Sequence, residues 1–158
     1  MDKDFKELLS LFNADMTKIF EVRPASPHET LTIMTNRRNI PGTSPYEPII
    51  GFSRAVRLGN HVYVSGTGPV GAEDASPADQ TRAVLAIIKT ALEQAGASFE
   101  HVYRTRMFLA HAEDWEEIGR AHGEVFGKIL PASTMVVAAL LNPKWRIEIE
   151  ADAYIPDA

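Results

Sequence analysis

The sequence contains no cysteine, which excludes disulfide bonds and every reaction that requires a thiolate. Positive charge is also scarce, because 16 lysines and arginines stand against 21 acidic residues, for a net charge of -5. Binding along a nucleic-acid backbone requires clustered basic side chains, so we expect no nucleic-acid partner. No apolar run reaches the roughly 20 residues of a membrane-spanning helix, and charged residues interrupt the N-terminus where a secretory signal would be apolar. These absences predict a soluble, cytoplasmic protein without a membrane partner.

The length of 158 residues suits one domain with an added segment, and we divide the chain into an N-terminal arm, 1–35, and a domain, 36–158. Apolar residues three and four apart predict an amphipathic helix over 2–20, and 31–35 are compatible with a short strand. Met34 is an alternative start site. Two interpretations of the arm therefore stay open: an addition to the protein, or a helix that packs on a neighbouring subunit.

The rest of the sequence predicts an α+β domain with elements in the order β-β-α-β-α-β-β. Ser76 and Gly96 are typical of residues that begin and end a helix, and Gly59 with Asn60 predicts a hairpin turn. The expected strands cover 53–58, 61–65, 101–110, 134–141 and 146–154, and the expected helices cover 76–95 and 113–126. Two helices can cover only one face of such a sheet, so we expect oligomerisation to cover the other.

Five short strings in this order resemble the Rid family of RidA/YjgF-like proteins. They occupy residues 51–56, 59–66, 80–82, 131–134 and 148–151, within a resemblance that spans about 36–156. The resemblance implies a chorismate-mutase-like α+β fold, with a mixed β-sheet covered on one face by two helices. It also implies a homotrimer with small-molecule pockets at the subunit interfaces.

The chemistry that the resemblance implies is the hydrolysis of enamines and imines such as 2-aminoacrylate, without a metal or a cofactor. In the family, an Arg after Pro-Ala pairs with the substrate carboxylate and a late Glu positions the attacking water. A Tyr and a Ser-Gly pair complete the pocket. In this sequence the catalytic Glu is Glu150, and the ligand-binding Ser-Gly pair is Ser65 and Gly66.

Four positions depart from the family pattern. The Arg falls on Ser133 and the Tyr on Phe52, while Met135 stands where Thr or Cys is common and Gly119 where the family has Asn. Ser133 cannot pair with a carboxylate, and Phe52 and Met135 make the ligand-binding wall more apolar. We therefore expect a divergent member that does not deaminate 2-aminoacrylate and whose substrate lacks the usual carboxylate or holds it elsewhere.

The alternative to such a deaminase-like hydrolase is a non-catalytic trimer that binds a small ligand or protects other proteins. A ribonuclease activity, which is attached to some members of the family, is not expected because the chain is acidic and has no basic stripe.

Two arginines are candidates to replace the missing one. Strand alternation predicts that Arg104 and Arg106 share one face, and that Arg146 shares a face with Glu148 and Glu150. Either Arg106 or Arg146 then binds the ligand, or these charges form a structural layer of ion pairs between subunits, which is the more common arrangement. For Glu150, catalysis and a purely structural interface role are equally compatible with the pattern.

Histidine and serine side chains add weaker candidates. His122, on the apolar side of the second predicted helix, is either an acid or base of the pocket or, more commonly, a satisfied buried residue. His111 and His122 have no third ligand at a useful spacing, so no metal site is predicted. Ser133 is a weak candidate for a nucleophile, because no His-Asp pair stands out by spacing.

Overall fold

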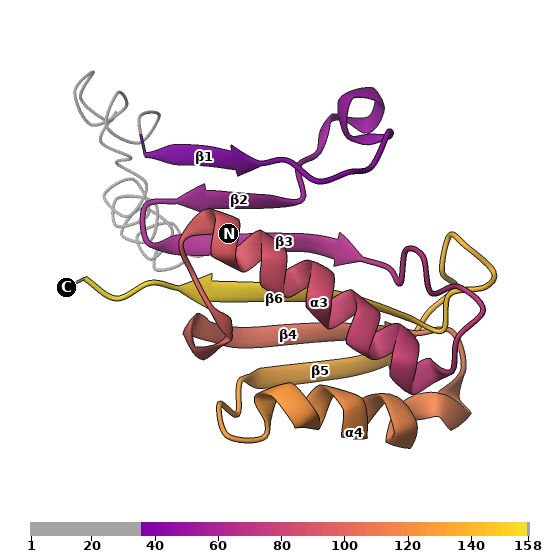
Figure 1. The fold of residues 1–158 in the computed structure, drawn as a ribbon. Coiled ribbons are helices and arrows are strands. Elements are labelled where there is room, and N and C mark those ends of the chain that lie inside the picture. The colour runs from indigo at the N-terminus through magenta and orange to yellow at the C-terminus, as the bar shows by residue number, and fades with distance from the viewer. Residues whose placement is uncertain (1–35, 158) are drawn as a thin grey trace, which may run out of the picture. The chain divides into compact units, whose positions relative to one another are not determined.

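A computed structural model describes residues 36–157 (Figure 1). The predicted arm helix over 2–20 and the short strand over 31–35 lie outside these described residues. In the described part, six strands form one mixed sheet in the order β1-β2-β3-β6-β4-β5. The strands are β1 (Arg37–Ile40), β2 (Ala55–Leu58), β3 (His61–Thr67), β4 (Val102–Leu109), β5 (Ala132–Val137) and β6 (Ile147–Tyr154). Neighbours are antiparallel except β4 and β5, which are parallel.

Helices α3 (Pro77–Ala95) and α4 (Trp115–Phe126) pack on the sheet (Figure 1). Ser76 begins α3 by accepting a hydrogen bond from the Asp79 backbone N–H, and Gly96 ends it at a φ of 83°. The core between helices and sheet is fully buried and consists largely of Ile88, Leu92, Leu109, Ile118, Ile147 and Ile149. The predicted α+β class and the two covering helices are thus confirmed.

Short helical turns complete the described chain. They are a π-helical turn, η1 (Glu47–Gly51), and two 3-10 turns, η2 (Phe99–His101) and η3 (Ala112–Asp114). The predicted hairpin is present, since Leu58 of β2 pairs with His61 of β3 around Gly59, whose φ is 58°. These turns set the ends of β2, β4 and α4.

The structure departs from the prediction most clearly at three elements. Strand β1 was not predicted, because an edge strand can carry charged side chains and this one has a single buried apolar residue, Ile40. Strand β5 ends at Val137 rather than at 141, and Leu141 is 96% exposed in the turn before Pro143. Helix α4 begins at Trp115, after η3, and Trp115 is 61% exposed. The helical periodicity of 113–126 would place this large apolar residue on the buried side, but it lies at the exposed first turn of α4.

The face of the sheet opposite the helices is open within residues 36–157. On β6, Glu148, Glu150, Asp152 and Tyr154 point to this open face and alternate with buried apolar residues that face the helices. Three tyrosines there, Tyr63, Tyr103 and Tyr154, each keep 42–43% of their surface exposed. A group of exposed aromatic rings is typical of an interaction surface, in line with the predicted oligomer.

Candidate functional site

The predicted ligand-binding residues divide into two groups on the sheet. Phe52 and Ser65 line one pocket together with Arg37, Asn39, Gly51, Ser53 and Val56, on the β1-β2-β3 side. Ser133 and Met135 instead lie on β5, the opposite edge strand. One chain therefore does not bring all the predicted ligand-binding residues together.

Hydrogen bonds to the backbone fix the residues around Ser65. Ser65 donates its hydroxyl proton to the Ser53 carbonyl at 2.8 Å, and its N–H donates to the Arg54 carbonyl at 3.0 Å. Arg54 donates to the Gly66 carbonyl and to the Thr67 hydroxyl, both at 2.9 Å. Burial lowers the pKa of Arg54, while the charges of Glu47 and Glu148 oppose that shift. The Ser65 oxygen is thus fixed at the pocket with lone pairs left to accept from a ligand.

Glu148 is a carboxylate that the resemblance did not single out. A Cβ atom at Gly66 would overlap its Oε1 atom, so the carboxylate lies directly against the glycine backbone. Burial raises the pKa of Glu148, and the neighbouring charge of Glu150 raises it further against the opposing effect of Arg54. The sequence did contain a signal for Glu148, since a residue two positions before Glu150 in the last strand lies on the same face of the sheet.

Glu150, the predicted catalytic residue, forms an ion pair within the chain. Arg106 lies opposite it in the β4–β6 register and donates from Nε to Glu150 Oε2 at 2.8 Å. The same guanidinium donates to both oxygens of Asp152, at 2.9 and 3.3 Å. These hydrogen bonds raise the pKa of Arg106. The contacts support a structural ion pair more than an arginine free to bind a ligand, and they lie within one chain, whereas the layer was expected between subunits.

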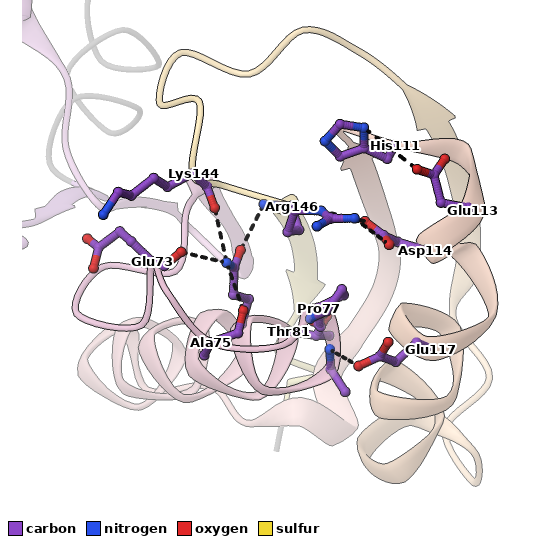
Figure 2. Close-up of polar contacts among 12 residues, drawn as sticks. Glu73, Ala75, Pro77, Thr81, His111, Glu113, Asp114, Glu117, Lys144 and Arg146 are labelled. Carbon is purple, nitrogen blue, oxygen red and sulfur yellow. Dashed lines mark hydrogen bonds and ion pairs between the residues drawn. The ribbon is translucent and has the colours of Figure 1, made fainter.

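Arg146, the other candidate, pairs with Asp114 (Figure 2). Its Nε and Nη2 atoms each donate to one carboxylate oxygen at 2.7 Å, and the Asp114 side chain is only 8% exposed. The predicted grouping of Arg146 with Glu148 and Glu150 is therefore wrong. Strand β6 begins at Ile147, so the alternation of the strand does not extend back to Arg146.

A buried amide fixes the segment that carries Arg146. Gln80 accepts from the Arg146 backbone N–H at 2.8 Å through Oε1. Its Nε2 atom donates to three carbonyl oxygens at 3.0 to 3.3 Å, those of Glu73, Ala75 and Lys144 (Figure 2). The start of α3 thereby holds the residues that lead into β6, and with them the position of Glu148 and Glu150.

The β5 group contains a chain of three polar side chains. Thr105 of β4 pairs in register with Ser133 of β5 and donates to the Ser133 hydroxyl at 3.1 Å. The same Thr105 oxygen lies 3.1 Å from Nε2 of His122 on α4. Thr105 is fully buried and His122 is 9% exposed, and burial lowers the pKa of His122. Sequence spacing did not reveal this contact, because the β4–β5 register creates it.

Met135 lies two residues further along β5 on the same side as Ser133. A Cβ atom at Gly119 of α4 would meet its Cε atom at 3.9 Å. Two positions that depart from the family pattern, Met135 and Gly119, are therefore neighbours. The thioether extends over space that a larger residue at Gly119 would share, so the two departures alter the same part of the surface.

Within residues 36–157, histidine and carboxylate side chains form no cluster of three that could hold a metal ion. In the same part of the chain, every helix is too short or too polar to cross a membrane.

Comparisons with known proteins agree with this architecture. An uncharacterised protein of Streptomyces coelicolor is 34% identical over 122 residues, 74% of this chain and 91% of that protein. The 3-aminoacrylate deaminase RutC of Acinetobacter baylyi is 34% identical over 119 residues, 72% of this chain and 93% of that protein. A YjgF/YER057c/UK114 family structure from Mycobacterium tuberculosis has a TM-score of 0.71 at 43% identity, over 75% of this chain and 99% of the other. The Ribonuc_L-PSP family, described as endoribonuclease L-PSP, matches residues 42–155, and the chain belongs to this YjgF/RidA family.

Proposed function

We propose that the protein is a homotrimer with small-molecule pockets at its subunit interfaces, and that it hydrolyses an enamine or imine without a free carboxylate. The separation of the two residue groups carries this proposal. Strands β6 and β4 lie between Ser65 on β3 and Ser133 on β5. At about 4.8 Å per strand, these edges of the site are roughly 14 Å apart. A second copy that sets its β5 beside the Phe52–Ser65 pocket would unite them.

The open face supports an oligomer independently. Tyr63, Tyr103 and Tyr154 are exposed there beside the ion pairs of Arg106. Covering such aromatic rings removes apolar surface from water, worth about 25 cal/mol per Å². A trimer that encloses these faces would also shield Glu148 and Glu150 from solvent.

Deaminase-type chemistry is supported by the similarity to RutC, whose described activity is 3-aminoacrylate deamination. In the proposed reaction, the substrate first takes up a solvent proton, at the β-carbon of an enamine or at the nitrogen of an imine, and becomes an iminium ion. Water then attacks the carbon of the C=N bond and gives a proton to Glu150. The C–O bond forms as the C=N π electrons move to nitrogen. Glu150 returns this proton to the amine nitrogen, and the C–N bond then breaks to release ammonia. The remaining hydroxyl loses its proton to the ammonia, which gives the carbonyl product and an ammonium ion.

The residues of the site have distinct roles in this proposal. Arg106 holds Glu150 through Oε2, which leaves Oε1 to accept a hydrogen bond from the water. Ser65 accepts a hydrogen bond from the substrate nitrogen. Nearby backbone amides polarise the substrate, and Phe52 and Met135 form an apolar wall. Ser133 replaces the carboxylate-binding Arg, so the substrate has no carboxylate at that end.

A non-catalytic trimer that binds a small ligand, or protects other proteins, is the second candidate. The observation that favours it is the Arg106 ion pair, because the carboxylate expected to activate water already has a cationic partner. In either case the cysteine-free, acidic chain fits a cytoplasmic protein without a nucleic-acid partner.

Two measurements test this proposal. The first is light scattering as the protein elutes from a size-exclusion column, and the second is an ammonia-release assay on enamines generated in situ. The trimer predicts a solution mass of three chains of 17.4 kDa. A monomer at micromolar concentration would overturn the interface pocket. Loss of ammonia release in Glu150→Gln, with the mass unchanged, is expected of the hydrolase. A fully active Glu150→Gln variant would remove the assigned role of that residue, and a trimer inactive on every enamine would favour the ligand-binding candidate.

A further inference from the structure

Three uncharged side chains connect the interior of the domain to the surface of β5. His122 on α4 contacts Thr105 on β4, and Thr105 contacts Ser133 on β5, each over 3.1 Å. The first two residues are buried, whereas Ser133 is exposed at the sheet edge. The hydroxyl of Thr105 thus links the buried His122 to Ser133, the residue that stands where the family has its arginine.

The direction of these hydrogen bonds depends on the tautomer of His122. Thr105 gives its only hydroxyl proton to Ser133 Oγ. In this arrangement the Thr105 oxygen accepts from His122, which corresponds to the tautomer of the neutral imidazole with its proton on Nε2. Ser133 accepts from Thr105 and keeps its own proton for a further partner. In this arrangement every donor of the three side chains points outward, toward the exposed surface of β5.

The surroundings of His122 keep this series of three hydrogen-bonded side chains uncharged. Its ring lies 4.6 Å from the ring of Phe126, centroid to centroid, on the same helix. Within residues 36–157, Thr105 is its hydrogen-bond partner and no carboxylate pairs with it. Burial lowers the pKa of His122, so the imidazole is neutral at neutral pH. Aligned neutral donors strengthen one another by about 10–30% per bond.

We infer that the His122–Thr105–Ser133 chain is a specificity element that donates a hydrogen bond from Ser133 to an uncharged acceptor on the ligand. The assignment rests on the proposed interface pocket. The fitting chemical class is a carbonyl oxygen of an amide, ester or ketone. A carboxylate would lose its hydration without gaining the charge-assisted, two-pronged contact that an arginine offers. Ser133 contacts the ligand, and Thr105 and His122 are positioning residues.

The tautomer of His122 tests the direction of the chain without any ligand. Long-range ¹H–¹⁵N correlation spectra distinguish imidazoles protonated at Nε2 from those protonated at Nδ1, and His122→Gln identifies the resonance. If the hydrogen bonds run outward from His122 through Thr105 to Ser133, wild type has the Nε2–H form. Thr105→Val, which has no hydroxyl, is expected to change the His122 shifts, whereas Thr105→Ser should retain them. An Nδ1–H form in wild type would overturn the outward direction, because Thr105 would then donate to His122.

Calorimetric binding of two probes of nearly equal size, pyruvamide and pyruvate, tests the ligand class. Wild type is expected to prefer the uncharged amide. Ser133→Ala should weaken pyruvamide binding about five- to tenfold, the effect of one neutral hydrogen bond, and leave pyruvate nearly unchanged. Ser133→Thr, which retains the hydroxyl, is the matched control and should bind like wild type. Ser133→Arg should reverse the preference.

The outcomes separate this inference from the proposed function. A wild type that prefers pyruvate, or a Ser133→Ala variant that binds pyruvamide unchanged, would overturn the specificity element and leave the pocket in place. A wild type that binds neither probe would overturn the small-molecule pocket at this edge, and the ligand assignment with it.

Discussion

Arg106 and Glu150 are direct cross-strand partners, and the guanidinium joins Glu150 to Asp152 two residues along the same strand. One cation thus organises two of the three carboxylates that β6 presents on the open face. Arg106 uses Nε and both Nη atoms in these contacts. This arrangement supports a structural role for Arg106 and a fixed orientation for Glu150.

Replacing Arg106 by methionine should destabilise the domain, because two adjacent carboxylates lose their cation. The pair is about one-third exposed, so we expect a loss of about 1–2 kcal/mol in urea unfolding rather than the larger cost of a fully buried pair. Arg120→Met is the matched control, since Arg120 pairs with Glu116 on the exposed face of α4. Its cost should be near zero, and equal costs for both variants would contradict the account.

Glu148→Gln should raise the thermal stability at pH 7 to 8. A carboxyl whose pKa is raised by folding binds its proton more tightly in the folded state, so the ionised group reduces stability as the pH rises. The gain in Tm should therefore shrink as the pH falls and the Glu148 carboxyl takes up its proton. Glu150→Gln makes the same change of charge but breaks the Arg106 pair, so it should lower Tm at neutral pH. A stabilising Glu150→Gln would be inconsistent with the ion pair.

Gln80→Leu should be among the most destabilising polar substitutions. It leaves an N–H and three carbonyl oxygens without their buried amide partner, at an expected cost of about 2–4 kcal/mol in urea unfolding. Gln94→Leu, on the exposed side of the same helix, is the control and should change stability by less than about 0.5 kcal/mol. If both variants unfold at the same urea concentration, Gln80 does not hold the segment before β6.

Acidification should test the burial of His122. Its pKa is lowered by folding, so the unfolded chain binds the proton more tightly, and stability is lost as the pH falls through about 6.5. His122→Gln retains an amide that can donate to Thr105 but does not titrate. The stability lost between pH 7 and 5 should be smaller in this variant than in wild type. His111→Gln, at a half-exposed site, is the control and should leave the loss unchanged.

Local signals in the sequence predicted the fold well. Ser76 and Gly96 identified the ends of α3, and the alternation in β6 identified which of its residues face the helices. These features depend on neighbouring residues, so a linear pattern contains them. Strand β1 was missed because only its pairing with β2, rather than its own composition, makes it a strand.

The contacts of the site depend on register and were less predictable. Ser133 and Thr105 are 28 residues apart, and Thr105 and His122 are 17 apart. Only the parallel pairing of β4 with β5 and the packing of α4 bring the three together. Arg146 was grouped with Glu148 and Glu150 for a related reason. The predicted strand began at residue 146, but β6 begins at Ile147, so strand alternation does not determine where the Arg146 side chain lies.

The most direct test of the account is the ratio of kcat/KM for two enamines generated in situ, 2-aminoacrylamide and 2-aminoacrylate, in wild type and Ser133→Arg. Both substrates have the same reacting group, so the ratio isolates the contact at Ser133. We expect wild type to prefer the uncharged amide and Ser133→Arg to reverse the preference toward the carboxylate. A wild type that deaminates 2-aminoacrylate as efficiently as Ser133→Arg would contradict it.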